Sequence, residues 1–204
     1  MRSSPRRRLP FSTVRLILAS RNAHKIRELG PLLAPHELEP LPDEVELPPE
    51  DGETFAANAL GKARAASAAT GRPAIADDSG IAAQALGGAP GVRSARFAGE
   101  DATDEDNLAR LLREAPAGSG LAYVCALAYV DPASGVEHVV EGRCSGTLAA
   151  DPRGDGGFGY DPAFVPDDDT TGRTMAELDP VEKDAISHRG RAAVALAHRL
   201  RERE

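Results

Sequence analysis

Two adjacent carboxylates, Asp77 and Asp78, follow a short apolar run at residues 74–76. Divalent cations such as Mg²⁺ prefer carboxylate oxygens, so a strand that ends in paired acids is a candidate metal site. Ser79 and Gly80 come next, and we expect them to turn the chain. An ordinary surface turn is the alternative, because Asp, Ser and Gly all favour turns. The rest of the chain has to decide between the two interpretations.

A second polar group, Ser20-Arg21-Asn22-Ala23-His24-Lys25, lies between an apolar β-branched run and a helical pattern. A helix N-terminus presents unpaired N–H groups and a partial positive charge, which suits a phosphate. Lys25 adds a full positive charge one turn into the helix. The segment lacks the Gly-x-x-x-x-Gly-Lys-Ser/Thr pattern of a Walker loop. A helix cap with a solvated lysine is the alternative.

Asn58 and Lys62 are four residues apart, so they project from one face of a predicted helix. Glu50 lies in the loop before this helix. With Asp77 and Asp78 it would complete an oxygen set for Mg²⁺, which takes one or two carboxylates and keeps several waters. Ordinary surface polar residues are the alternative.

Two further segments suit the organic part of a ligand. The loop Gly156-Gly157-Phe158-Gly159-Tyr160-Asp161-Pro162 sets aromatic rings between glycines, which favours a surface for stacking a base. A hairpin with one buried aromatic is the alternative. Lys183 and Ser187-His188-Arg189-Gly190-Arg191 place basic donors at a helix start, where they disfavour the helix and indicate a hydrogen-bond-accepting ligand. A Ser187 cap with solvated basic residues is the alternative.

Most of these candidate residues lie where predicted elements meet. We expect strands at 14–19, 37–40, 74–76, 121–130, 136–147 and 163–165, and helices at 23–33, 55–69, 104–113 and 188–201. Pro31 should end or distort the first helix. This order predicts an α/β fold with a mixed sheet and helices on its faces. We expect residues 14–204 to form a single domain and the Arg-rich residues 1–13 to be a disordered extension, with a start codon assigned too far upstream as the alternative.

The composition narrows the function classes. The 204 residues carry a net charge of −8, which argues against a nucleic-acid protein with a broad basic surface. The sequence contains no run of about 18 apolar residues, so it predicts no transmembrane helix. The N-terminus has no apolar segment after its arginines and does not resemble a secretory signal. The two cysteines, Cys125 and Cys144, suit a reducing compartment.

Five motifs in this order are more specific together than any one alone. They are Ser-x-Asn-x-x-Lys at 20–25, Thr-Phe-x-x-Asn-Ala-x-x-Lys-Ala at 54–63, Ala-Asp-Asp-Ser-Gly at 76–80, Gly-Gly-Phe-Gly-Tyr-Asp-Pro at 156–162 and Ser-His-Arg-Gly at 187–190. Together they closely resemble the ITPase/RdgB family of inosine/xanthosine triphosphate pyrophosphatases, which clear non-canonical purine nucleotides. The resemblance runs from about Val14 to Leu200.

The resemblance implies an elongated two-lobed α/β fold around a long curved mixed sheet, with the active site in the cleft between the lobes. It implies a homodimer, and with the composition we expect a cytoplasmic protein that binds neither nucleic acid nor membrane. It also implies a Mg²⁺-dependent reaction in which ITP, dITP or XTP and water give the monophosphate and pyrophosphate.

The family's residue roles carry over by position. The resemblance implies that Asp78 is the proton acceptor and that the metal is held by Glu50, Asp77 and Asp78. It implies that the triphosphate is held by Ser20, Arg21, Asn22, Ala23, His24, Lys25 and Lys62. It also implies that Phe158 stacks on the base, that His188 and Arg189 face the base edge, and that the nucleotide is further contacted by Ser79, Gly159, Tyr160, Asp161 and Lys183.

Two alternatives stay open beside this interpretation. One is a related pyrophosphatase for modified pyrimidine nucleotides, against which the large base-edge set argues. The other is a nucleotide-binding module without catalysis, which would gain nothing from three acids beside a triphosphate. A haloacid-type phosphatase would need Asp-x-Asp spacing, which Asp77-Asp78-Ser79-Gly80 does not have.

Overall fold

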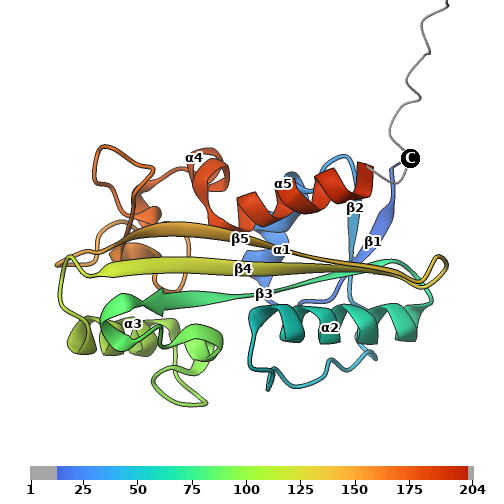
Figure 1. Cartoon of the computed structure of the whole chain (residues 1–204), viewed down its shortest axis with the longest axis horizontal. Helices are drawn as coiled ribbons and strands as arrows, with labels where there is room; N and C mark the ends of the chain where they lie inside the picture. Colours follow the sequence, from blue (N-terminus) through green and yellow to red (C-terminus); the bar gives the residue numbers. More distant parts are fainter. Residues whose placement is uncertain (1–12, 202–204) are drawn as a thin grey trace, which may run out of the picture.

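A six-stranded mixed sheet forms the centre of the computed structural model, which describes residues 13–201 (Figure 1). The strand order is β2-β1-β3-β4-β5-β6. The strands are β1 Arg15–Leu18, β2 Glu37–Pro40, β3 Ala74–Ala83, β4 Gly120–Asp131, β5 Val136–Leu148 and β6 Phe164–Pro166. β1 is parallel to β2 and β3, and the other pairs are antiparallel. The predicted α/β fold with a mixed sheet is therefore confirmed.

Within residues 13–201, five α-helices cover this sheet. They are α1 Ala23–Leu32, α2 Phe55–Thr70, α3 Asp104–Glu114, α4 Pro180–Ile186 and α5 His188–Arg201. α1 and α5 pack on one face and α2 on the other, while α3 lies toward the opposite end of the long strands (Figure 1). Thr54 caps the start of α2, and Gly71 at φ 65° ends it in the left-handed conformation, as glycine allows. Within residues 13–201 no helix is long and apolar enough to cross a membrane.

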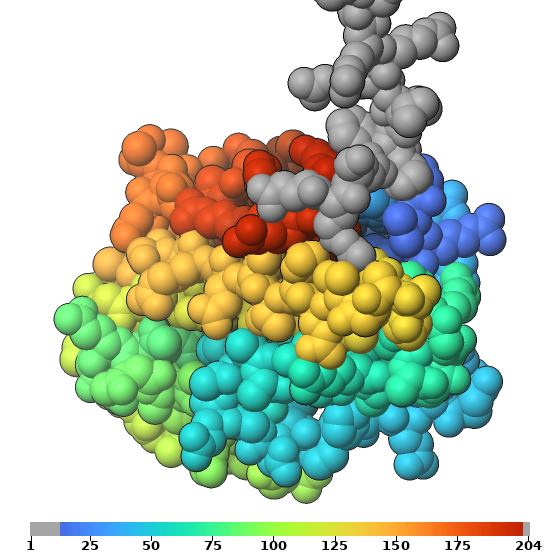
Figure 2. Space-filling model, turned by 45° about the vertical axis from the view of Figure 1, so that its right-hand side comes forward, coloured from blue at the N-terminus to red at the C-terminus, as the bar shows by residue number. Residues whose placement is uncertain are grey.

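The long strands β3, β4 and β5 connect two core regions (Figure 1). At one end Ile81, Leu111 and Phe164 belong to a core beneath α3 and the loops near β6. At the other end α2 buries alanines on one face of the sheet, and α1 and α5 bury leucines on the other. Figure 2 shows β5 as a gold band at the surface between α5 in red and α2 in cyan. These two ends are the two lobes of the expected elongated fold.

The Asp-Asp-Ser-Gly segment is not a turn, so this prediction was wrong. β3 continues through it to Ala83, and Asp78, Ser79 and Gly80 each pair with a residue of β4. The local turn preference of these residues gives way to a long antiparallel ladder. Gly80 is needed here for another reason, since a Cβ atom would lie 2.3 Å from Ser94 Oγ. Because side chains alternate along a strand, Asp77 and Asp78 point to opposite faces.

Other differences from the expected elements are smaller. The acidic segment before α5 contains a helix, α4, that we did not predict and that carries Lys183. Asp179 and Glu182 form a capping box around Pro180, so the signal for this helix was present. Pro31 lies in the last turn of α1, and the helix ends one residue after it. The predicted extension at 1–13 falls outside the described residues except for its last residue.

Candidate active site

A cavity of about 310 Å³ lies along the free edge of β3. β1 pairs with β3 only at Ala74 and Ile75, and a single bridge joins Ala82 to Pro90 farther along. The edge between them is therefore open, and both faces of β3 reach the cavity. The predicted residues that line it are Ser20, Arg21, Asn22, Lys25, Glu50, Lys62, Asp78, Ser79, Phe158, Gly159, Tyr160, Asp161, Lys183, His188 and Arg189. Its volume is that of a small-molecule site.

Of the predicted site residues, Ala23, His24 and Asp77 do not line the cavity. Ala23 is the first residue of α1. His24 stacks on Phe158 instead, with the ring centroids 4.9 Å apart. Asp77 is fully buried beneath the cavity.

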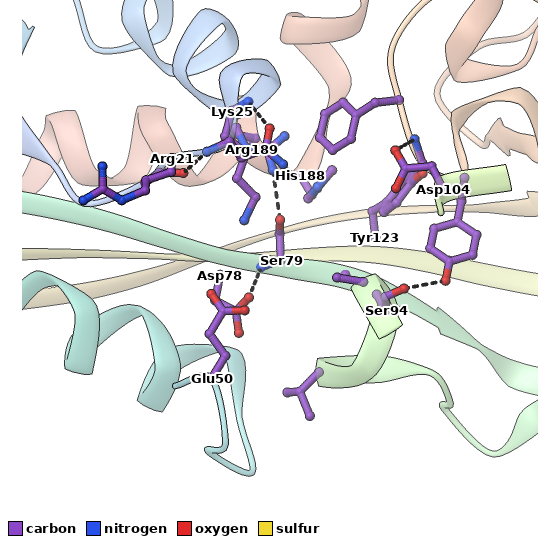
Figure 3. Close-up of a pocket in the computed structure, with 18 of the residues that line it drawn as sticks. Arg21, Lys25, Glu50, Asp78, Ser79, Ser94, Asp104, Tyr123, His188 and Arg189 are labelled. Carbon is purple, nitrogen blue, oxygen red and sulfur yellow. Dashed lines mark hydrogen bonds between the residues drawn. The ribbon is translucent and has the colours of Figure 1, made fainter. Parts of the chain in front are cut away.

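The carboxylates Glu50 and Asp78 lie on one side of β3 (Figure 3). Asn58 Nδ2 donates to Asp78 Oδ2 at 2.8 Å, and the Ser79 amide donates to Asp78 Oδ1 at 2.9 Å. Lys62 Nζ donates to a Glu50 carboxylate oxygen and, at 2.7 Å, to the Asp77 carbonyl. Burial and the nearby charge of Glu50 raise the pKa of Asp78 above its ordinary value of 3.8. A raised pKa makes Asp78 a better proton acceptor near neutral pH.

Asp77 points to the other side of β3 and meets positive charge there. Its Oδ2 lies 3.1 Å from Lys25 Nζ and 3.2 Å from Arg189 Nη2. Burial alone would raise the pKa of this carboxyl, but Lys25, Arg189 and Lys62 outweigh burial and hold the pKa below its ordinary value. Asp77 is therefore a charged partner that positions cations, and it does not share a face with Asp78.

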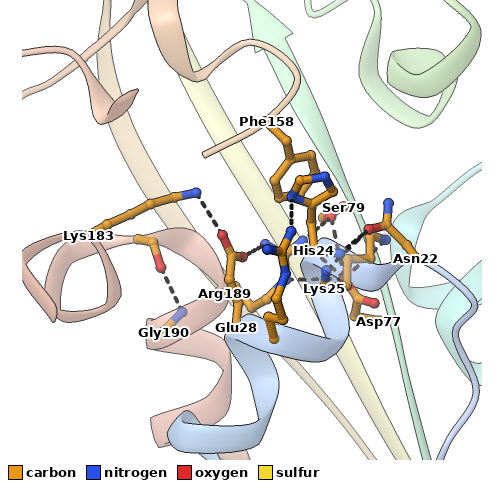
Figure 4. Close-up of polar contacts among 12 residues, drawn as sticks. Asn22, His24, Lys25, Glu28, Asp77, Ser79, Phe158, Lys183, Arg189 and Gly190 are labelled. Atoms are coloured by element: carbon orange, nitrogen blue, oxygen red, sulfur yellow. Dashed lines mark hydrogen bonds and ion pairs between the residues drawn. The ribbon is translucent and has the colours of Figure 1, made fainter. Parts of the chain in front are cut away.

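The segment before α1 forms the predicted helix start. Asn22 Oδ1 accepts from the amides of His24 at 2.9 Å and Lys25 at 3.2 Å. Ser20 Oγ accepts from the Asn22 amide at 3.2 Å. Arg21 lines the cavity, and its side chain extends toward the loop after β2, where its Nη2 donates to the carbonyls of residues 43 and 45 at 3.1 and 3.0 Å. The cap leaves Lys25 directed at the cavity and at Asp77 (Figure 4).

The glycine-rich loop is fastened by its buried residues. Asp161 accepts from the Phe158 amide at 2.9 Å, from Tyr123 Oη at 3.0 Å and from Lys183 Nζ at 2.8 Å. Tyr160 Oη donates to the Ser94 carbonyl at 2.7 Å. Tyr160 and Asp161 therefore position the loop, while the ring of Phe158 lines the cavity.

Glu28 of α1 is a site residue that sequence reasoning missed. Its carboxylate pairs with Lys183 Nζ at 2.7 Å and with Arg189 Nη1 (Figure 4). Burial raises the pKa of this carboxyl, but Arg189 and Lys183 outweigh burial and lower it. Glu28 follows Lys25 by three residues, so helical spacing placed both on one face of α1. Its partners, however, lie more than 150 residues away along the chain.

His188 presents an uncharged ring to the cavity. Burial, reinforced by Arg189 and Lys183, lowers its pKa well below the ordinary value, so the imidazole is neutral near pH 7. Its ring stacks on Tyr123 with centroids 4.6 Å apart and planes 11° from parallel. Within residues 13–201 no group hydrogen-bonds to the buried Nδ1 atom of His188.

Tyr123 also lines the cavity and was not predicted, because a tyrosine in an apolar strand indicates a core residue. We expect Tyr123→Phe to lower the free energy of unfolding by about 1.5–3 kcal/mol, since it leaves a charged acceptor, Asp161, without its hydroxyl partner. Tyr160→Phe is the matched control, because it removes a bond to a neutral carbonyl and should cost about 1 kcal/mol. Urea denaturation measures both. An equal or smaller loss in Tyr123→Phe would contradict this account.

Known proteins that are similar in sequence to this chain belong to the family that the motifs resemble. The sequence profile of the Ham1 family matches residues 16–199. A dITP/XTP pyrophosphatase of Frankia alni is 53% identical over 93% of this chain and 98% of its own length. A dITP/XTP pyrophosphatase of Streptomyces coelicolor is 50% identical over 92% of this chain and 98% of its own length.

Solved structures are similar in fold. A HAM1 protein from Coxiella burnetii superposes with a TM-score of 0.81 at 39% identity, and the match covers 93% of this chain and all of that one. A nucleoside-triphosphatase, also described as a dITP/XTP pyrophosphatase, from Mycobacterium abscessus gives a TM-score of 0.69 at 47% identity, covering 89% of this chain and 98% of that one.

Proposed function

The chain belongs to the Ham1 family, and from this premise we propose that it hydrolyses non-canonical purine nucleoside triphosphates to the monophosphate and pyrophosphate. Its substrates are ITP, dITP and XTP. One observation carries the proposal: a single cavity has two carboxylates on one side of β3 and, on the other, buried cations beside an aromatic ring. A nucleoside triphosphate needs such a site, with metal and base chemistry at its phosphates and stacking with hydrogen bonds at its base.

We propose that Glu50 and Asp78 hold Mg²⁺. Nucleotide pyrophosphatases of this family generally depend on a divalent metal. The two carboxylates fit such an ion because they lie on one side of β3, where burial and the charge of Glu50 raise the pKa of Asp78, and a bound cation would offset both effects. Within residues 13–201 no cluster of three acidic, histidine or cysteine side chains forms a closed metal cage, and Mg²⁺ needs only one or two carboxylates beside substrate phosphates. Bound Mg²⁺ would neutralise phosphate charge and favour ionisation of water.

Asp77, which the family resemblance also assigned to metal, is left out of this set. Its Oδ2 atom faces Lys25 and Arg189 on the opposite side of β3. We propose that Asp77 instead holds these two cations in the cavity. The pair of neighbouring acids thus divides into a metal and base residue, Asp78, and a residue that positions cations, Asp77.

The chain's own groups supply the remaining chemistry. Lys25, Lys62 and the N-terminus of α1 oppose the charge of the triphosphate. Water attacks the α phosphorus, the bond from that phosphorus to the oxygen bridging the α and β phosphates breaks, and the proton of the water moves to Asp78 as pyrophosphate leaves. Asn58 keeps the Asp78 carboxylate in place through its 2.8 Å hydrogen bond. Catalysis in this proposal is mostly charge neutralisation and positioning of the water.

Base selection follows from the hydrogen-bonding groups at the other end. Arg189 and Lys183 are donors only, and the neutral ring of His188 has one donor and one acceptor nitrogen. Donors suit the 6-oxo group of hypoxanthine and xanthine. Adenine presents an amino group at that position, which cannot accept a hydrogen bond from these donors.

A nucleotide panel with pyrophosphate detection tests the proposed function. We expect kcat/KM for ITP, dITP and XTP to exceed that for ATP by on the order of 10⁴, because the 6-amino group of adenine cannot accept a hydrogen bond from the buried donors. Modified UTP and dTTP are included, since preferential turnover of these would identify a pyrimidine-specific enzyme instead. Equal turnover of ATP and ITP, release of orthophosphate alone, or no Mg²⁺-dependent hydrolysis would each contradict the proposal.

We further propose that the enzyme acts as a cytoplasmic homodimer and binds neither nucleic acid nor membrane. The family resemblance supports the dimer, and the net charge of −8 disfavours a nucleic-acid partner. Light scattering of the full chain measures the mass in solution, and the mass of one chain would contradict the dimer.

A further inference from the structure

We propose that His24 fixes the ring of Phe158 from outside the cavity and thereby determines how tightly the base is bound. The inference rests on the proposed function, because it concerns the ring on which the base would stack. The family resemblance groups His24 with the residues that hold the triphosphate. The position of its ring assigns it to the opposite end of the ligand.

The stack between the two rings is direct. The ring centroids of His24 and Phe158 are 4.9 Å apart, and the ring planes differ by 27° (Figure 4). Phe158 lines the cavity and His24 does not. His24 therefore covers a part of the Phe158 ring that the cavity leaves free, which is the arrangement of a support behind a stacking surface.

His24 is itself held in place by α1. Arg27 Nη2 lies 2.8 Å from His24 Nδ1, and Arg27 Nε donates to the Ala23 carbonyl at 3.3 Å. The His24 amide donates to the Asn22 cap at 2.9 Å. The imidazole is thus fixed to the first turn of the helix whose start faces the phosphates.

Phe158, in contrast, has little support from its own loop. Its neighbours Gly157 and Gly159 both adopt positive φ, at 72° and 63°, where glycine is the residue that fits without strain. Its amide is tied to Asp161, and two cations lie near the ring, with Lys183 Nζ 5.3 Å and Arg189 Cζ 5.8 Å from its centroid. A stacking partner from α1 would restrict a ring that glycines leave free to move. Restricting it before the base arrives avoids part of the entropy cost of binding.

The test is His24→Ala, with His24→Phe as the rescue variant. We expect His24→Ala to raise KM for ITP and Kd for inosine monophosphate about 2- to 10-fold, the range that an aromatic pair supplies, with kcat changed little. His24→Phe should restore both values, because it keeps a ring and loses only the contact with Arg27. The inhibition constant of inorganic tripolyphosphate should not change in either variant, since this probe has no base.

A double-mutant cycle makes the inference specific. In a Phe158→Ala background, His24→Ala should have no further effect on Kd for inosine monophosphate, because the contact is already lost. His198→Ala, far along α5, controls for replacing an exposed histidine, and thermal unfolding checks that each variant is folded. The inference would be overturned by an unchanged or lower KM in His24→Ala, or by weaker tripolyphosphate inhibition. It would also be overturned if His24→Ala raised Kd for inosine monophosphate equally in the Phe158→Ala background. If the wild-type chain failed to hydrolyse ITP, the proposed function would fall, while the monophosphate Kd values would still decide the role of His24.

Discussion

Asp78→Asn is expected to lower kcat for ITP by about 10²- to 10⁴-fold, the range that a general base contributes. A carboxamide cannot take the proton from the attacking water. It keeps the size of the carboxylate and an oxygen that can accept from Asn58, so we expect nucleotide binding to change little. Steady-state assays give kcat, and calorimetry with inosine monophosphate gives binding. Turnover close to that of the wild type would exclude Asp78 as the proton acceptor.

The same substitution should stabilise the metal-free protein. The pKa of Asp78 is raised in the folded state, so folding there favours the protonated form, and the ionised carboxylate costs stability above its folded pKa. A neutral asparagine removes that cost, and its melting temperature measured in EDTA at pH 7 should rise. Loss of activity with a gain in stability is the pattern of a functional residue held in an unfavourable site.

Asp77→Asn is the matched control, because it changes the adjacent carboxylate on the other face of β3. The pKa of Asp77 is lowered in the folded state by its cations, so the ionised form stabilises the fold above its unfolded pKa. We therefore expect Asp77→Asn to lower the melting temperature at pH 7, opposite in sign to Asp78→Asn. Shifts of the same sign in both variants would contradict the division of roles between the two acids.

The error at this pair of residues shows what local sequence can decide. Asp, Ser and Gly individually favour turns, so a tetrapeptide of these residues, taken alone, predicts a turn. The ladder to β4 overrides them, and it depends on residues some 50 positions later that pair from Ala74 to Ala83. Once β3 is known to be continuous, the period of two along a strand separates the acids. The residue types were therefore visible in the sequence, but their directions were not.

The site residues that could be predicted from the sequence were likewise those that depend on local features. The starts of α1 at Ala23 and of α5 at His188 are local features, and both were predicted at these residues. Glu28 and Tyr123 were missed because their partners are remote: Lys183 and Arg189 for the first, and Asp161 and His188 for the second. A glutamate on a helix and a tyrosine in a strand carry no signal until the sheet brings these segments together.

Arg189→Met should lower both stability and base discrimination. The Arg189 side chain is only 2% exposed, and it pairs with Asp77 Oδ2 at 3.2 Å and with Glu28. Removing one partner of a buried ion pair leaves an uncompensated charge, which costs about 3–5 kcal/mol. Urea denaturation at pH 7 measures this loss. Kinetics on the folded variant should show a lower ratio of ITP to ATP turnover, because a donor to the 6-oxo group is missing.

Arg191→Met is the control, two residues farther along α5. Arg191 forms an exposed pair with Asp168 at 2.8 Å, so its loss should cost no more than about 1 kcal/mol. The pH dependence separates the two variants further. Arg189 helps to lower the pKa of Asp77, so its stabilising effect is complete above the ordinary carboxyl pKa of 3.8 and is lost as the pH falls through the lower, folded pKa. The cost of Arg189→Met should therefore shrink in acid, and a cost that stays constant down to the acid limit of folding would contradict the pairing with Asp77.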